Sequence, residues 1–222
     1  MTGTLVFLAV LLALCLGWIV RQSINVRPWV AETPGPWAPD RLPPAATAAR
    51  VGLGVFLAVV TSFFMLSISA YMMRMESGND WLPVSPPGLL WVNTVVLVMG
   101  SLALQLAWNA ARHDDPKRLR FGLLAGGAFT ILFIIGQLAA WRQLYGDGGF
   151  LTGNPAASFF YLVTALHGLH LLGGLVAWGR TLARVRRGDT PARILVSVEL
   201  CALYWHFLLL LWLGLFVLLL ST

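Results

Sequence analysis

The side chains best suited to chemistry are three histidines and one glutamate that lie inside apolar stretches of the sequence. His167 and His170 are three residues apart, so on a helix they share one face. Glu199 and His206 are seven residues apart, about two helical turns, and they also share a face. If the two faces meet, the imidazoles and the carboxylate form one polar cluster, with Trp205 beside it.

Such a cluster has a chemical and a structural interpretation. Histidine and glutamate together suit zinc, iron or copper by ligand type, and a haem held by two of the histidines is another alternative. His167 and His170 lie on the same side of one helix, however, and cannot be opposite axial ligands of one haem. Polar contacts also commonly hold membrane helices together. We expect a structural cluster in two layers, His170 with Glu199 and His167 with His206, and no metal or cofactor bound by this chain.

The composition shows what kind of elements must position these residues. The chain has 222 residues, of which 58% are hydrophobic and 11% charged, and its mean hydropathy is +0.78. A soluble globular domain carries about 25% charged residues. Cys15 and Cys201 lie in different apolar stretches, which excludes a disulfide scaffold, and the low charge excludes a disordered chain. The composition therefore predicts a protein whose solvent is largely lipid.

Apolar stretches of membrane-spanning length organise the whole sequence. They cover residues 4–20, 51–73, 88–110, 121–141, 157–178 and 195–220. Each approaches or exceeds the roughly 17–25 residues that a helix needs to cross a bilayer. In hydrocarbon the backbone must satisfy its own hydrogen bonds, so each stretch predicts a helix. We therefore expect an all-α integral membrane protein with six transmembrane helices.

The first of these helices is expected to be an appendage to the other five. Residues 1–4 carry no charge, unlike the start of a signal peptide, so we expect the helix at 1–21 to be retained. Prolines crowd the segment that follows, and residues 22–49 are expected to form a cytoplasmic linker. Residues 50–222 then form a five-helix core.

Paired glycines and one amide inside the apolar stretches predict close contacts between helices. Gly126-Gly127 and Gly173-Gly174 would permit close packing of helices. Gln137 could form a hydrogen bond to a neighbouring helix.

The basic residues predict the orientation in the membrane. Of the 15 lysines and arginines, all but Arg74 and Arg142 lie in or beside the loops 21–50, 111–120 and 179–194. Cytoplasmic loops carry an excess of Lys and Arg, so these three loops are expected to be cytoplasmic and both termini periplasmic. The same rule explains the basic isoelectric point of about 10.2, and no nucleic-acid partner is expected.

Several motifs resemble one known family. Residues 164–174 read Thr-Ala-Leu-His-Gly-Leu-His-Leu-Leu-Gly-Gly, and Glu199 is followed by Tyr-Trp-His-Phe at 204–207 and by Trp212. Further elements are Arg50-Val51-Gly52, Leu89-Leu90-Trp91-Val92-Asn93-Thr94, and Gln137 with Trp141. In this order over residues 50–220, they resemble subunit III of haem–copper oxidases, whose shorter bacterial forms have five helices.

The resemblance implies a function without an active site. Such a subunit is a non-catalytic part of a terminal oxidase of aerobic respiration, which couples oxygen reduction to proton pumping in the bacterial cytoplasmic membrane. It packs against subunit I, which holds the haems and a copper, in a complex that includes subunit II. Its helix bundle has a cleft for phospholipids. Arg50 and Arg193, at the expected cytoplasmic edge, are candidate partners for a lipid phosphate.

Three acidic residues of the family are replaced here. Val60, Ala140 and Leu209 stand at positions where the family usually carries acids. An accessory subunit of a nitric oxide reductase is therefore an alternative, since it needs no oxidase proton antenna. A metal or haem enzyme that uses the histidine and glutamate cluster is a second alternative. The sequence does not specify whether cytochrome c or quinol is the electron donor, nor the haem types of the partner.

Overall fold

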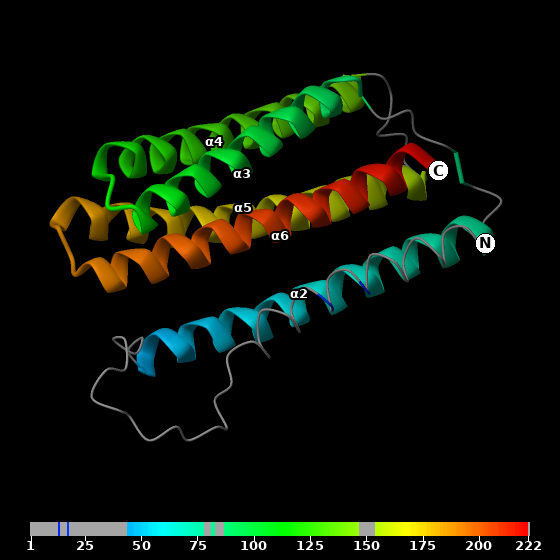
Figure 1. Cartoon of the computed structure of the whole chain (residues 1–222). Coiled ribbons are helices and arrows are strands. Elements are labelled where there is room, and N and C mark those ends of the chain that lie inside the picture. The colour runs from blue at the N-terminus through cyan, green and yellow to red at the C-terminus, as the bar shows by residue number, and fades with distance from the viewer. Residues whose placement is uncertain are drawn as a thin grey trace. The chain divides into compact units, whose positions relative to one another are not determined.

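The computed structural model describes residues 44–77, 81–82, 87–146 and 154–221, together with the isolated positions 13 and 17. Its helices are α2 (Pro44–Ser77), α3 (Leu89–Arg112), α4 (Pro116–Gly146), α5 (Pro155–Arg187) and α6 (Pro191–Ser221) (Figure 1). The predicted helix at 1–21 and residues 22–43 of the predicted linker lie outside the described residues, apart from those two positions. α2 begins at Pro44, earlier than the predicted boundary at residue 50, because proline fits the first helical turn and alanines follow it.

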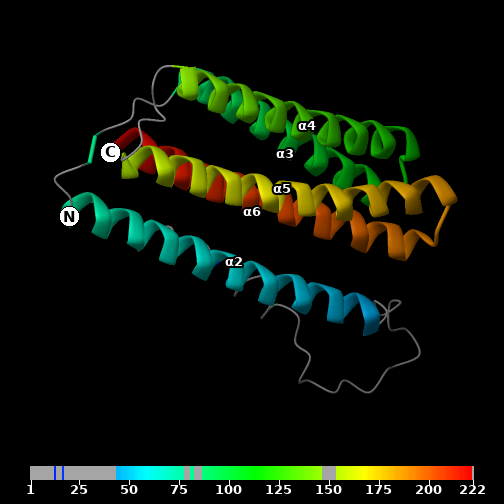
Figure 2. The ribbon, with the colours of Figure 1, turned by 180° about the vertical axis from the view of Figure 1, so that it is seen from behind.

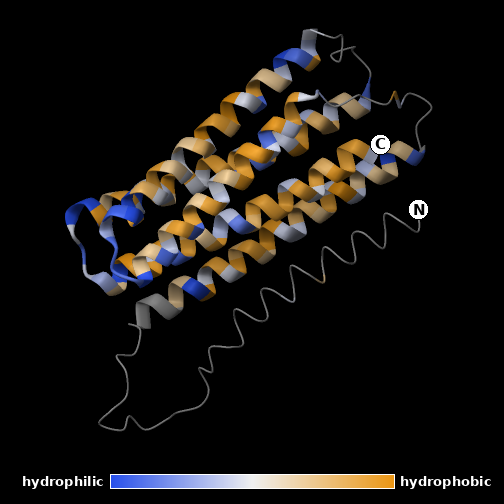
Figure 3. Ribbon diagram, turned by 45° about the horizontal axis from the view of Figure 1, so that its top comes forward, coloured by the Kyte–Doolittle hydropathy of each residue, from blue (hydrophilic) through white to orange (hydrophobic). Residues whose placement is uncertain are grey.

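All five helices are long and apolar enough to span a membrane. Their candidate spans contain between 24 and 33 residues, whereas about 20 residues suffice for a bilayer core. Large apolar side chains such as Leu66 and Phe121 are exposed on their outer faces. Hydrophilic residues gather where α3 turns into α4 and where α5 turns into α6 (Figure 3). The prediction of an integral membrane protein is confirmed for these five helices.

The starts of the helices follow from local sequence. Pro116, Pro155 and Pro191 each occupy the first residue of a helix, where the missing N–H costs nothing. The Asp115 carboxylate accepts from the backbone N–H groups of Lys117 and Arg118, at 3.1 and 3.0 Å. Asn154 caps α5 in the same way, since its side chain accepts from Ala156 N at 3.0 Å. These caps satisfy backbone N–H groups in the first turns of α4 and α5 and so stabilise the starts of the two helices.

The short turns contain the residues with a left-handed backbone. Asp114, between α3 and α4, has φ 51°, a conformation that aspartate tolerates better than most residues. Gly188, which ends α5, has φ 71° and its N–H bonds back to the last turn of the helix. Both turns therefore reverse the chain within a few residues and make α3–α4 and α5–α6 antiparallel hairpins.

Contacts divide the chain into two units, Met1–Val60 and Thr61–Thr222. Within the second unit α3 packs against α4 and α6, and α5 packs against the same two helices. Figures 1 and 2 show the two hairpins side by side, with both short turns at one end. The core therefore lies between four helices, and the largest fully buried side chains include Trp205, Trp212 and Phe133.

Glycines allow the closest helix approaches. A Cβ at Gly122 would lie 2.8 Å from the backbone of Ala103 and Ala107 on α3. A Cβ at Gly127 would overlap the Trp178 indole of α5. The predicted close contacts at Gly126 and Gly127 are therefore confirmed. In the second pair, Gly174 contacts Tyr204 and Trp205, whereas a Cβ at Gly173 would meet nothing within 4 Å.

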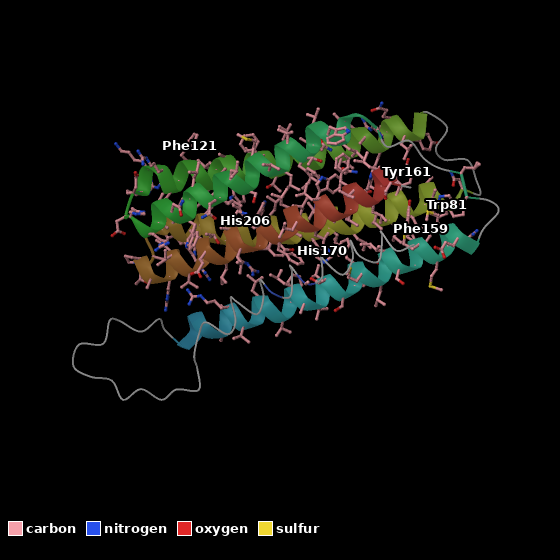
Figure 4. The ribbon with its side chains drawn as sticks, turned by 45° about the vertical axis from the view of Figure 1, so that its right-hand side comes forward. Trp81, Phe121, Phe159, Tyr161, His170 and His206 are labelled. Carbon is pink, nitrogen blue, oxygen red and sulfur yellow. The ribbon has the colours of Figure 1, made fainter. Side chains whose placement is uncertain are left out.

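An aromatic group stands at the end of the bundle opposite the short turns. The Tyr71 ring meets Trp81 and Phe159 edge-on, with centroid separations of 5.0 and 5.5 Å (Figure 4). Asn154 Nδ2 donates to the carbonyl of Leu82 at 3.1 Å. These contacts attach the connection after α2 to the start of α5.

Candidate functional site

His206 connects α6 to α3 rather than to α5. Its Nδ1 is hydrogen-bonded to the Ser101 hydroxyl, and its Nε2 lies 2.7 Å from Gln105 Oε1 (His206 is labelled in Figure 4). A glutamine oxygen can only accept, so Nε2 carries the proton, and in the neutral imidazole Nδ1 then accepts from the serine hydroxyl. Ser101 and Gln105 are one turn apart on α3. Both ring nitrogens are thus used, and the imidazole forms an interhelical clamp between α6 and α3.

His167 lies in a different environment and does not pair with His206. It is fully buried on α5, and neither ring nitrogen has a hydrogen-bond partner among the described residues. Its ring centroid lies 5.2 Å from that of Trp212 on α6 and 5.8 Å from that of Phe133 on α4. The expected layer of His167 with His206 is not formed, because the two imidazoles face different neighbouring helices.

His170 and Glu199 are both half-buried, on α5 and α6. His170 Nδ1 lies 2.7 Å from the carbonyl of Leu166, one turn back, and its ring packs against Phe64 of α2 at 5.4 Å. Tyr204 of α6 donates its hydroxyl to the backbone carbonyl of His170 at 2.9 Å. His170 is therefore attached to α6 through Tyr204, and its pairing with Glu199 stays a prediction.

Indole donors form a second set of interhelical bonds that was not predicted. Trp205 donates to Thr130 Oγ1 at 2.8 Å, and Trp212 donates to Thr94 Oγ1 at 3.0 Å. Two more indoles bond between α4 and α5: Trp141 to Thr164 Oγ1 at 3.0 Å, and Trp178 to the Leu123 carbonyl at 2.8 Å. Three of these bonds could have been suspected from threonines inside the apolar stretches, because a buried indole N–H needs a hydrogen-bond acceptor.

The arrangement is suited to holding helices together. Among the described residues, no group of three or more His, Cys, Asp and Glu side chains is placed to hold a metal ion. His206 and Trp205 instead bond to separate helices, α3 and α4. His206 and His167 therefore act at separate contacts of the bundle, the first at α3 and the second between α4 and α6.

A basic group occupies the end of α5 and the start of α6. The side chains of Arg180, Arg184, Arg186, Arg187 and Arg193 are all exposed. Arg184 Nη1 donates to Ser197 Oγ at 2.6 Å, and that hydroxyl donates to the Arg193 carbonyl at 2.7 Å. The serine thus links the two helices of the hairpin while the Arg193 guanidinium stays accessible. Arg50, the other candidate, is half-buried on α2 in the unit Met1–Val60.

The three positions at which the resemblance implies acids, Val60, Ala140 and Leu209, differ in burial. Ala140 is completely buried on α4 and Val60 on α2 is 3% exposed, whereas Leu209 on α6 is half-buried. A carboxylate at Ala140 would be enclosed by protein and would need a partner there. The apolar replacement is therefore consistent with the surrounding core.

Comparisons with known proteins agree with the motifs. Residues 50–221 match the family described as cytochrome c oxidase subunit III. The chain is 32% identical over 173 residues to a probable cytochrome c oxidase subunit 3 of Mycobacterium tuberculosis, covering 75% of this chain and 84% of the relative. It is 33% identical over 174 residues to cytochrome c oxidase subunit 3 of Synechocystis, covering 75% and 72%. The matched region contains α3 to α6 and most of α2. The chain therefore belongs to the cytochrome c oxidase subunit III family.

Proposed function

We propose that this protein is an accessory, non-catalytic subunit of a haem–copper terminal oxidase. The observation that carries the proposal is the family match over residues 50–221, which contains the whole four-helix core. In this role the chain packs against the catalytic subunit I, which holds the haems and copper, within a complex that contains subunit II. It contributes no reacting group of its own to oxygen reduction.

The exposed apolar surface supports assembly with other membrane components. Leu102 and Leu106 are 52% and 60% exposed on α3, and Ile135 is 57% exposed on α4. In a bilayer such faces meet lipid chains or neighbouring transmembrane helices. The hydrogen bonds of Trp205 and His206 hold α6 against α4 and α3, which supports a bundle whose outer faces keep a fixed arrangement.

The charge distribution supports an orientation in the bacterial cytoplasmic membrane. Arg112, Lys117, Arg118 and Arg120 flank the α3–α4 turn, and the arginines of the α5–α6 hairpin lie at the same end (Figure 1). By the positive-inside rule we expect this end in the cytoplasm and the C-terminus in the periplasm. Relatives in Mycobacterium and Synechocystis support a bacterial membrane.

Phospholipid is the expected small partner. Arg50 and Arg193 lie close to the starts of α2 and α6, at the cytoplasmic ends of these helices in the proposed orientation. An arginine at the lipid–water boundary can bind a headgroup phosphate through two parallel hydrogen bonds. The exposed Arg193 side chain is available for this contact.

Purification through an affinity tag on this chain in mild detergent tests the proposed function. Haem and copper should arrive with larger partner chains, giving an oxidase spectrum, and should stay with those partners when this chain is stripped off. Haem iron without copper would favour association with a nitric oxide reductase. Metal that remains on the isolated chain would overturn the proposal.

A further inference from the structure

Three buried polar side chains in the core have atoms that form no hydrogen bond within the described part of the chain. Asn93 is 3% exposed, Gln137 5% and His167 0%. The atoms without a partner among the described residues are Asn93 Nδ2, both polar atoms of Gln137 and both ring nitrogens of His167. A buried polar group without a hydrogen bond costs about 1–3 kcal/mol. Native proteins therefore rarely keep several such groups together.

The contacts of their neighbours place these side chains at one level of the bundle. The Asn93 amide lies against Gly136, where a Cβ would overlap it, and Gly136 directly precedes Gln137 on α4. Gln137 follows Phe133 by one helical turn, on the same face. Phe133 is the ring that packs against His167, with 5.8 Å between centroids.

A second set of contacts completes the enclosure. Trp212 of α6 lies against His167 at 5.2 Å and against Phe133 at 5.0 Å between ring centroids. Its indole donates to Thr94, the residue after Asn93. On the other side, the hydrogen bond of Trp141 to Thr164 joins α4 and α5 one turn beyond Gln137 and His167. All four helices α3 to α6 therefore contribute to the surroundings of the unpartnered atoms.

The unpartnered donors and acceptors of these three side chains indicate what kind of molecule could bind between them. Asn93 Nδ2 and Gln137 Nε2 are donors, Gln137 Oε1 is an acceptor, and a neutral imidazole offers one of each. A cation would need several oxygen or nitrogen acceptors, and no metal-holding group occurs in this described part of the chain. A molecule that both donates and accepts, and is small enough for a helix core, is water.

We propose that Asn93, Gln137 and His167 form a buried water-binding site between α3, α4 and α5, closed by Trp212 of α6. At least one ordered water accepts from an amide and donates to Gln137 or His167, joining side chains of different helices whose unpartnered atoms do not bond to one another directly. The site is independent of the oxidase partners, since every contributing residue belongs to this chain.

Radiolytic footprinting of the purified full-length chain, with whatever partners accompany it, tests the site. X-rays convert bound water into hydroxyl radicals that oxidise adjacent side chains. Trp212 and Trp205 are both 0% exposed, but Trp205 bonds to Thr130 instead of bordering the site, so Trp205 is the internal control. Trp212 should be oxidised several-fold faster than Trp205. Equal, slow oxidation of the two indoles would overturn the proposal.

A double variant and a high-resolution map test whether the water is bound by these particular side chains. In Gln137→Leu combined with His167→Phe, oxidation of Trp212 should fall to the rate of Trp205; an unchanged rate would show that these side chains hold no water. A high-resolution cryo-electron microscopy map of the unsubstituted protein should show water density within hydrogen-bonding distance of at least two of the three side chains. Direct hydrogen bonds between Gln137 and His167, with no density, would refute the site even if the variant failed to fold.

Discussion

Trp205 of α6 donates its indole N–H to the hydroxyl oxygen of Thr130 on α4, at 2.8 Å, and both side chains are completely buried. Thr130 in turn donates to the carbonyl of Gly126, one turn earlier. The threonine thus satisfies the indole without leaving its own hydroxyl hydrogen unpaired. This bond crosses the bundle between helices far apart in the sequence.

Thr130→Val should destabilise the bundle, because it removes the acceptor but preserves the shape of the side chain. The buried indole N–H is then unpaired, at an expected cost of about 1–3 kcal/mol. The melting temperature in detergent should fall. Thr130→Ser, which keeps the oxygen, is the matched control and should fall less. Equal melting temperatures for Thr130→Val and the unsubstituted protein would contradict this account.

Gly122→Ala should destabilise the α3–α4 interface by overpacking. Its Cβ would lie 2.8 Å from the backbone of Ala103 and Ala107, which cannot rotate away. Overpacking of this kind costs about 1–3 kcal/mol. Gly168→Ala, where a Cβ meets nothing within 4 Å, is the control. A thermal denaturation series should show a lower melting temperature only for the first variant.

The clamp at His206 should appear as energetic coupling between α3 and α6. His206→Leu and Gln105→Leu each leave a polar partner behind, so the double variant should be less destabilised than the sum of the two. The expected coupling is about 0.5–3 kcal/mol in a double-mutant cycle. The exposed His113 provides a comparison, since His113→Leu combined with His206→Leu should be additive. Additive destabilisation in both cycles would contradict an interaction between His206 and Gln105.

Labelling from one side of the membrane should establish the proposed orientation. In a chain with Cys15 and Cys201 replaced by serine, Asp189→Cys at the α5–α6 turn should react with an impermeant maleimide only after the cytoplasmic face is opened. Gly146→Cys, at the exposed end of α4, should react in intact spheroplasts. The reverse pattern would invert the topology.

Removing the exposed guanidinium of Arg193 should reduce bound phospholipid. Arg193→Ala and Arg50→Ala complexes should each retain less lipid per protein by mass spectrometry, because a charge-assisted contact to phosphate is lost. Arg142→Ala, at the other end of the bundle, should retain the normal amount. Unchanged lipid in both test variants would refute a headgroup site at these residues.

The membrane class, the family and the positions of the last four helices could be predicted from the sequence alone, with most helix ends within about five residues, although α5 extends nine residues beyond its predicted end at 178. These properties are local: hydropathy over about 20 residues marks a span, and proline, aspartate and glycine mark the starts and the turns. Motifs such as Tyr204-Trp205-His206-Phe207 are contiguous in the chain and could be read directly. The close contacts at Gly126 and Gly127 also followed from residue size alone.

Which polar side chains meet depends on how the helices pack. His167 and His206 were expected in one layer from their depths, but depth does not give the rotation of a helix about its axis. That rotation directs His206 toward Ser101 and Gln105 of α3 and leaves His167 between Phe133 and Trp212. The side chains of Asn93 and Gln137 come from different helices, so their joint burial with His167 depends on the packing of the whole bundle rather than on any local pattern.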